Sequence, residues 1–221
     1  MMIKPGFVVA VLGAESSGKT QLTLDLAHRL RSAGVDAQAV PEHLREFCDL
    51  HRRTPRRDEQ PAIAAEQTHR IATAAERHRV VVADTTALMT AVYSEIVFGD
   101  RSQYAAVEAA QRRCDLTLLM ALDLPWRADG LQRDGAHVRE PVDALVRAAL
   151  ARIGQSYVVV AGQGEARGQS AWRAVQRALA LPADPDAGDD EAALTVWHMR
   201  CERCGDADCE RHLLPRRLAT D

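Results

Sequence analysis

The chain has 221 residues, of which 47% are apolar and 27% charged, a composition typical of globular domains and unlike that of disordered, collagen-like or membrane-spanning proteins. Its 28 basic and 31 acidic residues give a formal net charge of −3, which argues against general electrostatic binding of nucleic acid or anionic lipid. No apolar run approaches the roughly 20 residues that a bilayer requires, and the apolar start leads into a glycine-rich motif instead of a cleavage site. We therefore expect a cytoplasmic protein that does not enter a membrane.

Short β-branched apolar runs alternate with segments of helical periodicity. In the first half of the chain the pattern predicts a strand at 7–12, a helix at 19–30, a strand at 35–40, a helix at 61–79 and a strand at 80–84. It then predicts helices at 85–98 and 104–113, a strand at 115–122, a helix at 142–153, a strand from Tyr157 and a helix at 170–181. The segments 42–60 and 125–141 are predicted to be irregular, the second a mobile loop. This alternation predicts an α/β fold with a parallel sheet between helices.

The composition changes near the end of the chain. Residues 1–181 carry the strand and helix signals and are predicted to form one domain. Residues 182–193, PADPDAGDDEAA, are predicted to be an acidic linker because they are rich in proline and acids and lack apolar periodicity. Residues 194–221 form a cysteine- and histidine-containing tail that is too short to build a core of its own.

The segment from Gly13 to Thr20, GAESSGKT, matches the phosphate-loop pattern G-x-x-x-x-G-K-[ST] at every fixed position. Glycines at both ends let successive backbone N–H groups face phosphate oxygens, and the following helix adds its positive end. Lys19 is informative because Lys4 is the only other lysine; it would contact the β- and γ-phosphates, while the Thr20 hydroxyl would bind Mg²⁺. A strand-to-helix turn without ligand is the alternative. The predicted nucleotide-binding residues are Gly13, Ala14, Glu15, Ser16, Ser17, Gly18, Lys19 and Thr20.

A phosphate loop of this kind needs a carboxylate at the end of a neighbouring strand to hold Mg²⁺. Asp84 ends the apolar run VVVAD and is the preferred candidate; Asp123, which follows the next strand, is the alternative. Three arginines in the segment 125–141 are positioned to close over a transferring phosphoryl group and neutralise its charge, unless the segment is simply a solvated loop. They are Arg127, Arg133 and Arg139, with Arg133 preferred as the catalytic one.

Several further patches resemble the nicotinamide-riboside kinase domain of the bacterial NAD-regulator family and its AAA-like P-loop ATPase relatives. Together with the phosphate loop they cover about residues 8–181: VPEHLREF from Val40, the helix at 60–70, VADTTALMTAVYSEIVFG from Val82, and PWRADGLQRD from Pro125. The resemblance implies a P-loop kinase that uses ATP to phosphorylate a ribosyl hydroxyl of a small nucleoside such as nicotinamide riboside; the phosphate-loop motif alone does not separate ATP from GTP. The lid residues that it implies are Trp126, Asp129 and Arg133.

By the same resemblance, Glu42 and Arg45 would line the acceptor pocket, and Asp84 would act at the metal and the acceptor hydroxyl. An exposed helix start is the alternative for Glu42 and Arg45. The chain departs from the family at Thr86, where a second aspartate is common, so a carboxylate is expected to be missing beside the acceptor. If that acid orients the ribose or acts as the base, either Glu42 replaces it or the protein is slow, uses another acceptor or is not a kinase.

The tail contains Cys201, Cys204, Cys209 and His212 in the spacing C-x2-C-x4-C-x2-H, with His198 as an alternative fourth ligand. Three thiolates and an imidazole suit structural zinc, and unligated thiols are the alternative. Arginines surround the motif, which supports a second hypothesis: a nucleotide-dependent ATPase or switch whose tail binds protein or RNA. In a third hypothesis, the phosphate loop is kept and the tail only packs against the body. The isolated Cys48 and Cys114 are expected to be core or surface thiols.

Overall fold

The computed structural model describes residues 4–126, 136–182 and 196–197. Its strands are β1 (Phe7–Leu12), β2 (Ala37–Val40), β3 (Val80–Asp84), β4 (Leu116–Met120), β5 (Tyr157–Val160) and β6 (Val196–Trp197). Its α-helices are α1 (Lys19–Ser32), α2 (His43–His51), α3 (Gln60–Arg77), α4 (Ala87–Phe98), α5 (Tyr104–Gln111), α6 (Arg139–Arg152) and α7 (Gly164–Leu179). Short 3-10 helices, η1 (Arg57–Glu59) and η3 (Ala136–Val138), precede α3 and α6. Among the described helices, none combines the length and the apolar character needed to cross a membrane.

The strands form one sheet in the order β2-β3-β1-β4-β5-β6. The first five are parallel, which confirms the predicted parallel α/β sheet. The last strand was not predicted: β6 pairs antiparallel with β5, with Trp197 beside Tyr157 and Val196 beside Val158. The start of the tail therefore continues the sheet of the body. Residues 183–195, which include all but the first residue of the predicted linker, and residues 198–221 of the predicted tail lie outside the described residues.

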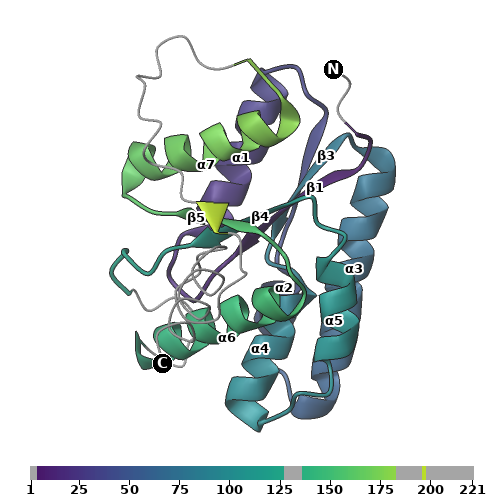
Figure 1. Ribbon diagram of the computed structural model, residues 1–221. Coiled ribbons are helices and arrows are strands. Elements are labelled where there is room, and N and C mark those ends of the chain that lie inside the picture. The colour runs from purple at the N-terminus through teal and green to yellow at the C-terminus, as the bar shows by residue number, and fades with distance from the viewer. Residues whose placement is uncertain (1–3, 127–135, 183–195, 198–221) are drawn as a thin grey trace, which may run out of the picture.

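Each face of the sheet is covered by helices, so the central strands are apolar on both sides. In β1, Val9 and Val11 pack with α1 and α7, whereas Val8, Ala10 and Leu12 pack on the face covered by α3, α4, α5 and α6. Figure 1 shows these two helix layers on opposite sides of the sheet. The carboxyl ends of β1 and β3 meet at one edge of this sandwich, which is the edge that the phosphate loop occupies.

Three predicted boundaries were wrong. The segment 42–60 is not irregular: it contains α2 and η1. Leu44, Phe47 and Cys48 of α2 have the apolar spacing of a helix, but the rest of the segment is polar. The loop 125–141 ends earlier than expected, because η3 and α6 begin at Ala136 and Arg139. Helix α7 starts at Gly164 instead of residue 170, since its first turn is polar.

Candidate nucleotide and acceptor sites

The phosphate loop joins β1 to α1, and two of its side chains bond to one of its own carbonyl groups. Ser17 Oγ and Lys19 Nζ both donate to the carbonyl oxygen of Ala14, at 2.7 Å and 3.0 Å. Gly13 has φ 148° and Gly18 has φ 84°, values that glycine adopts without strain. A Cβ atom at Gly13 would lie 2.8 Å from Met120 Cβ, so no larger residue fits there. The loop thus has the compact turn that the motif predicts.

Asp84 meets the loop because β3 lies beside β1, with Asp84 in register with Val11. Thr20 Oγ1 donates a hydrogen bond of 2.6 Å to Asp84 Oδ2. Asp84 is only 2% exposed, and its Oδ1 is buried without a hydrogen-bond partner among the described residues. A buried carboxylate oxygen without a donor is costly unless a cation or ordered water contacts it. The hydroxyl and carboxylate oxygens are ligands that Mg²⁺ prefers, so the two predicted metal residues fit that ion.

Asp123, the alternative metal ligand, is already engaged on both oxygens. Its Oδ2 accepts from the Gly162 backbone N–H at 2.6 Å, and its Oδ1 accepts from Arg167 Nη2. Arg167, in α7, also donates from Nη1 to the carbonyl of Ser17 at 3.1 Å and from Nε to the carbonyl of Gly162 at 2.8 Å. Burial lowers the pKa of the Arg167 guanidinium, and the Asp123 carboxylate opposes that shift. Arg167 therefore ties the phosphate loop to the β5–α7 connection, a role that no sequence pattern indicated.

The three arginines of segment 125–141 do not share one environment. Arg139 is not on a mobile loop as predicted: it opens α6, is 8% exposed, and its Nη1 donates to the Leu124 carbonyl at 2.8 Å. Its Nε and Nη2 are buried without a hydrogen-bond partner among the described residues. Arg127, Arg133 and the lid residue Asp129 lie outside the described residues, whereas Trp126 is half-buried at the edge of that gap.

A cleft that is partly open to solvent lies directly beside the phosphate loop. The loop contributes Glu15, Ser16 and Lys19, and the segment entering α2 contributes Glu42, Leu44 and Arg45. Helix α4 and its surroundings add an apolar and aromatic wall of Met89, Tyr93, Val97 and Phe98. The cleft therefore places carboxylates, cations and aromatic rings around one space next to Lys19, as a second substrate would need.

Glu42 and Arg45 both line this cleft, as the family resemblance implies. Glu42 precedes the first turn of α2, its side chain is 11% exposed, and its Oε2 lies 3.7 Å from Arg45 Nε. Asp84, in contrast, does not line the cleft and contacts Thr20 instead. The structure thus separates the three residues predicted to serve the acceptor: Glu42 and Arg45 line the cleft, and Asp84 lies beside Thr20 at the phosphate loop.

Gln67 in α3 holds the backbone on which Glu42 sits. Its Oε1 accepts from the His43 N–H at 2.8 Å, and its Nε2 donates to the carbonyls of Pro41 at 3.3 Å and Thr85 at 3.5 Å. Thr85 follows Asp84 with φ 68°, a left-handed conformation that is rare and strained for a β-branched residue. One buried amide therefore couples the end of β3 to the segment that carries Glu42.

Thr86, where the family commonly has an aspartate, lies outside the acceptor cleft. Its Oγ1 accepts from the Leu88 N–H at 3.3 Å as the N-cap of α4 and donates to Gln111 Oε1 at 2.7 Å. Gln111 in turn donates from Nε2 to Thr117 Oγ1 at 3.1 Å. Position 86 therefore faces a buried polar cluster of α4, α5 and β4 and does not line the cleft, and the effect of the missing aspartate on an acceptor stays a prediction.

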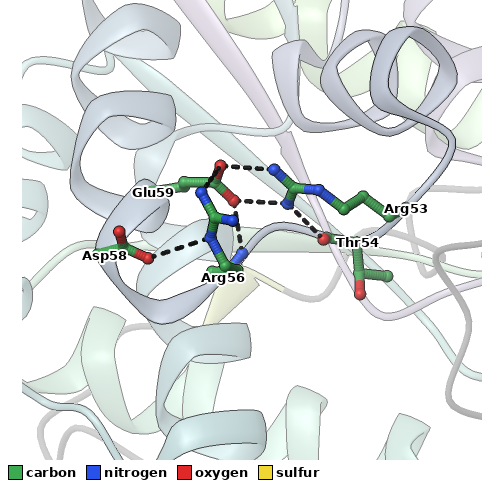
Figure 2. A network of polar contacts seen from close by, with 5 residues as sticks. All are labelled: Arg53, Thr54, Arg56, Asp58 and Glu59. Atoms are coloured by element: carbon green, nitrogen blue, oxygen red, sulfur yellow. Dashed lines mark hydrogen bonds and ion pairs between the residues drawn. The ribbon is translucent and has the colours of Figure 1, made fainter.

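A network of polar contacts holds the turn between α2 and α3 (Figure 2). Arg53 donates hydrogen bonds of 2.6 Å to both carboxylate oxygens of Glu59 and one of 3.0 Å to the Thr54 carbonyl. Arg56 adds a backbone N–H bond of 2.8 Å and a side-chain bond of 3.1 Å to the same carboxylate. These donors, Arg53 first, lower the pKa of Glu59 to about 2. Thr54 and Pro55, which line the cleft, lie between the tethered residues, so the network fixes their part of the cleft wall.

Of the five cysteines, two lie among the described residues and three do not. Cys48 and Cys114 are buried cysteines that form no disulfide among the described residues, and burial raises the pKa of Cys114 to about 12. The predicted zinc ligands Cys201, Cys204, Cys209, His212 and His198 lie outside the described residues. Within the part of the chain that the structure describes, no group of three or more histidine, cysteine, aspartate or glutamate residues could hold a metal.

A family model described as an AAA domain matches residues 8–167. The chain belongs to the AAA domain family. Among solved structures, this AAA domain is similar to a NadR protein crystallised in complex with NR, with a TM-score of 0.65 and 20% sequence identity. The likeness covers 80% of this chain and 51% of the NadR chain, so the protein spans about half of that relative's length. A search of the curated proteins finds no match. The resemblance to AAA-like P-loop proteins is confirmed, and the fold is shared with NadR.

Proposed function

We propose that this AAA domain is a Mg-ATP-dependent kinase that transfers the γ-phosphoryl group to a hydroxyl of a nucleoside-like acceptor, with nicotinamide riboside as the first candidate. The observation that carries the proposal is the cleft beside Lys19, because it is lined by Glu42 and Arg45 and by the aromatic side chains of α4, a mixture that suits an organic acceptor. An ATPase needs room only for water at this position. The similarity to a NadR protein in complex with NR supports the choice of acceptor.

On the donor side, the phosphate loop would cradle the triphosphate through its backbone N–H groups, and Lys19 would neutralise charge on the β- and γ-phosphates. Thr20 and Asp84 would hold Mg²⁺, which would offset phosphate charge when bound. Arg133, with Arg127 and Arg139, would approach from segment 125–141 and stabilise the charge that develops during transfer.

On the acceptor side, the hydroxyl oxygen forms a bond to the γ-phosphorus while the bond from that phosphorus to the β–γ bridging oxygen breaks, and ADP leaves. Glu42 would orient the hydroxyl and receive its proton, because Glu42 lines the cleft whereas Asp84 is committed to Thr20. Arg45, 3.7 Å from Glu42, would hold that carboxylate in place and help to position the acceptor.

An ADP-release assay across a panel of nucleosides, with nicotinamide riboside included, tests the proposal. We expect release that depends on Mg²⁺ and is stimulated by an acceptor, together with a product heavier than the acceptor by one phosphoryl group. Release that no nucleoside stimulates, but that RNA or a protein partner does, would replace the kinase by the ATPase or switch.

We further propose that residues 194–221 form a small extension that holds structural zinc through Cys201, Cys204, Cys209 and His212, with His198 as the alternative to His212. Pairing of β6 with β5 supports an extension that is attached to the body. Metal analysis of protein purified without chelator should find about one zinc per chain. Protein that contains no zinc, and whose stability is unaffected by Cys201→Ser, would remove the zinc site.

A further inference from the structure

Two glutamines on the inner face of α3 have opposite hydrogen-bonding states. Gln60 and Gln67 lie two turns apart and are 4% and 2% exposed. Gln67 bonds to three backbone groups, through both its amide oxygen and its amide nitrogen. Gln60 Oε1 is equally buried but has no hydrogen-bond partner among the residues that the structure describes. The two amides therefore serve different purposes.

Gln60 lines the acceptor cleft together with Lys19 and Glu42. A buried amide oxygen without a donor lowers the stability of the protein that carries it, so its presence calls for a partner outside the described chain. In a substrate cleft, that partner is a donor group on the ligand. An amide oxygen that is left unpaired until the substrate arrives also discriminates strongly against compounds without the donor.

The backbone of Gln60 is fixed in advance. Gln60 follows Glu59, which Arg53 and Arg56 hold (Figure 2), and it precedes Pro61 at the start of α3. Its φ of −56° and ψ of −43° are helical, a conformation that a following proline disfavours. The Glu59 network stabilises this entry to the helix. A side chain presented from such a fixed position loses less freedom when it binds a ligand.

We propose that Gln60 recognises the acceptor, with its Oε1 accepting a hydrogen bond from an N–H or O–H group of the nucleoside. The inference rests on the proposed kinase function and adds a specificity residue to it. It assigns to Gln60 no part in binding ATP or in the transfer of the proton.

The test is Gln60→Met, which keeps the length of the side chain and removes the amide. The KM for the acceptor should rise about tenfold, whereas the KM for ATP and the acceptor-independent ATP hydrolysis should not change. The unfolding midpoint of the unliganded protein should stay the same or rise, because a buried unpaired oxygen is removed. Gln103→Met is the matched control: Gln103 is a buried glutamine whose amide also lacks a partner among the described residues, but it does not line the cleft.

Nicotinamide riboside and nicotinic acid riboside separate the two kinds of donor, because only the first carries an amide N–H. If Gln60→Met raises the KM for nicotinamide riboside alone, the donor is the amide N–H. If it raises the KM for both nucleosides equally, the donor is a ribosyl hydroxyl. Both results support the inference. An acceptor KM like that of the wild type in Gln60→Met overturns it. A wild-type protein that phosphorylates no acceptor overturns the proposed function instead, and this inference with it.

Discussion

The phosphate loop and the acceptor cleft meet at Lys19 but are built in different ways. The loop is one segment of the chain, and Ser17 and Lys19 close it through a single carbonyl, that of Ala14. The cleft collects residues from the loop, the start of α2, the turn before α3 and helix α4, and an ion-pair network holds its wall. Substitutions in the loop should therefore abolish turnover, whereas substitutions around the cleft should change how the acceptor binds.

Lys19→Ala should have the largest effect. Removal of the ammonium group from the phosphates is expected to lower kcat about a thousandfold, because charge stabilisation dominates phosphoryl transfer. The free energy of unfolding should change by no more than about 0.5 kcal/mol, since Lys19 is half-exposed. ADP release and urea unfolding measure the two quantities. Lys4→Ala is the control: Lys4 pairs with Asp115 at the amino end of the sheet, 2.8 Å away, and its loss should leave kcat unchanged. Wild-type turnover by Lys19→Ala would remove the loop from the reaction.

Asp84→Asn should have the second-largest effect and confirm which strand end serves the metal. The amide can still accept the Thr20 hydrogen bond, but it loses the charge that binds Mg²⁺, so kcat should fall about a hundredfold and the Mg²⁺ requirement should rise. Titration of activity with Mg²⁺ gives both values. Asp123→Asn is the comparison, because Asp123 is engaged by Arg167 and Gly162 and should alter stability instead of the Mg²⁺ requirement. The reverse pattern would transfer the metal role to Asp123.

The loop is one segment of the chain and the cleft is built from several, and this difference explains what the sequence could and could not predict. The loop, its strand and helix, and Asp84 follow from local patterns, because each depends on neighbours along the chain. Helix α2 was missed although Leu44, Phe47 and Cys48 have a helical spacing, because it is short and the segment around it is polar. Arg167 and Gln60 gave no signal, since their roles come from contacts with residues brought together only by the fold. The hydrogen bond of Thr86 to Gln111 likewise could not be predicted, since the two residues are 25 positions apart and meet only in the fold.

Glu59→Gln should have a smaller effect, confined to the cleft wall. The neutral amide weakens the grip of Arg53 and Arg56 on the turn that carries Thr54 and Pro55, so the acceptor KM should rise about threefold while the KM for ATP stays unchanged. The control is Glu66→Gln, which removes an α3 carboxylate that is also paired with an arginine, Arg70, but that lies away from the turn carrying Thr54 and Pro55. Equal KM changes in both variants would mean that the wall does not position the acceptor.

The effect of Glu59→Gln on the stability of the fold is predicted to depend on pH. The pKa of Glu59 is about 2 in the folded protein, below its ordinary value of 4.5. Between these values the unfolded chain takes up a proton that the folded protein does not, so this ion pair stabilises the fold fully above pH 4.5 and progressively less as the pH falls towards 2. The difference in urea midpoint between the wild type and Glu59→Gln should therefore shrink over that range. A difference that stays constant from pH 5 to about pH 2 would show that Glu59 acts through its shape and not its charge.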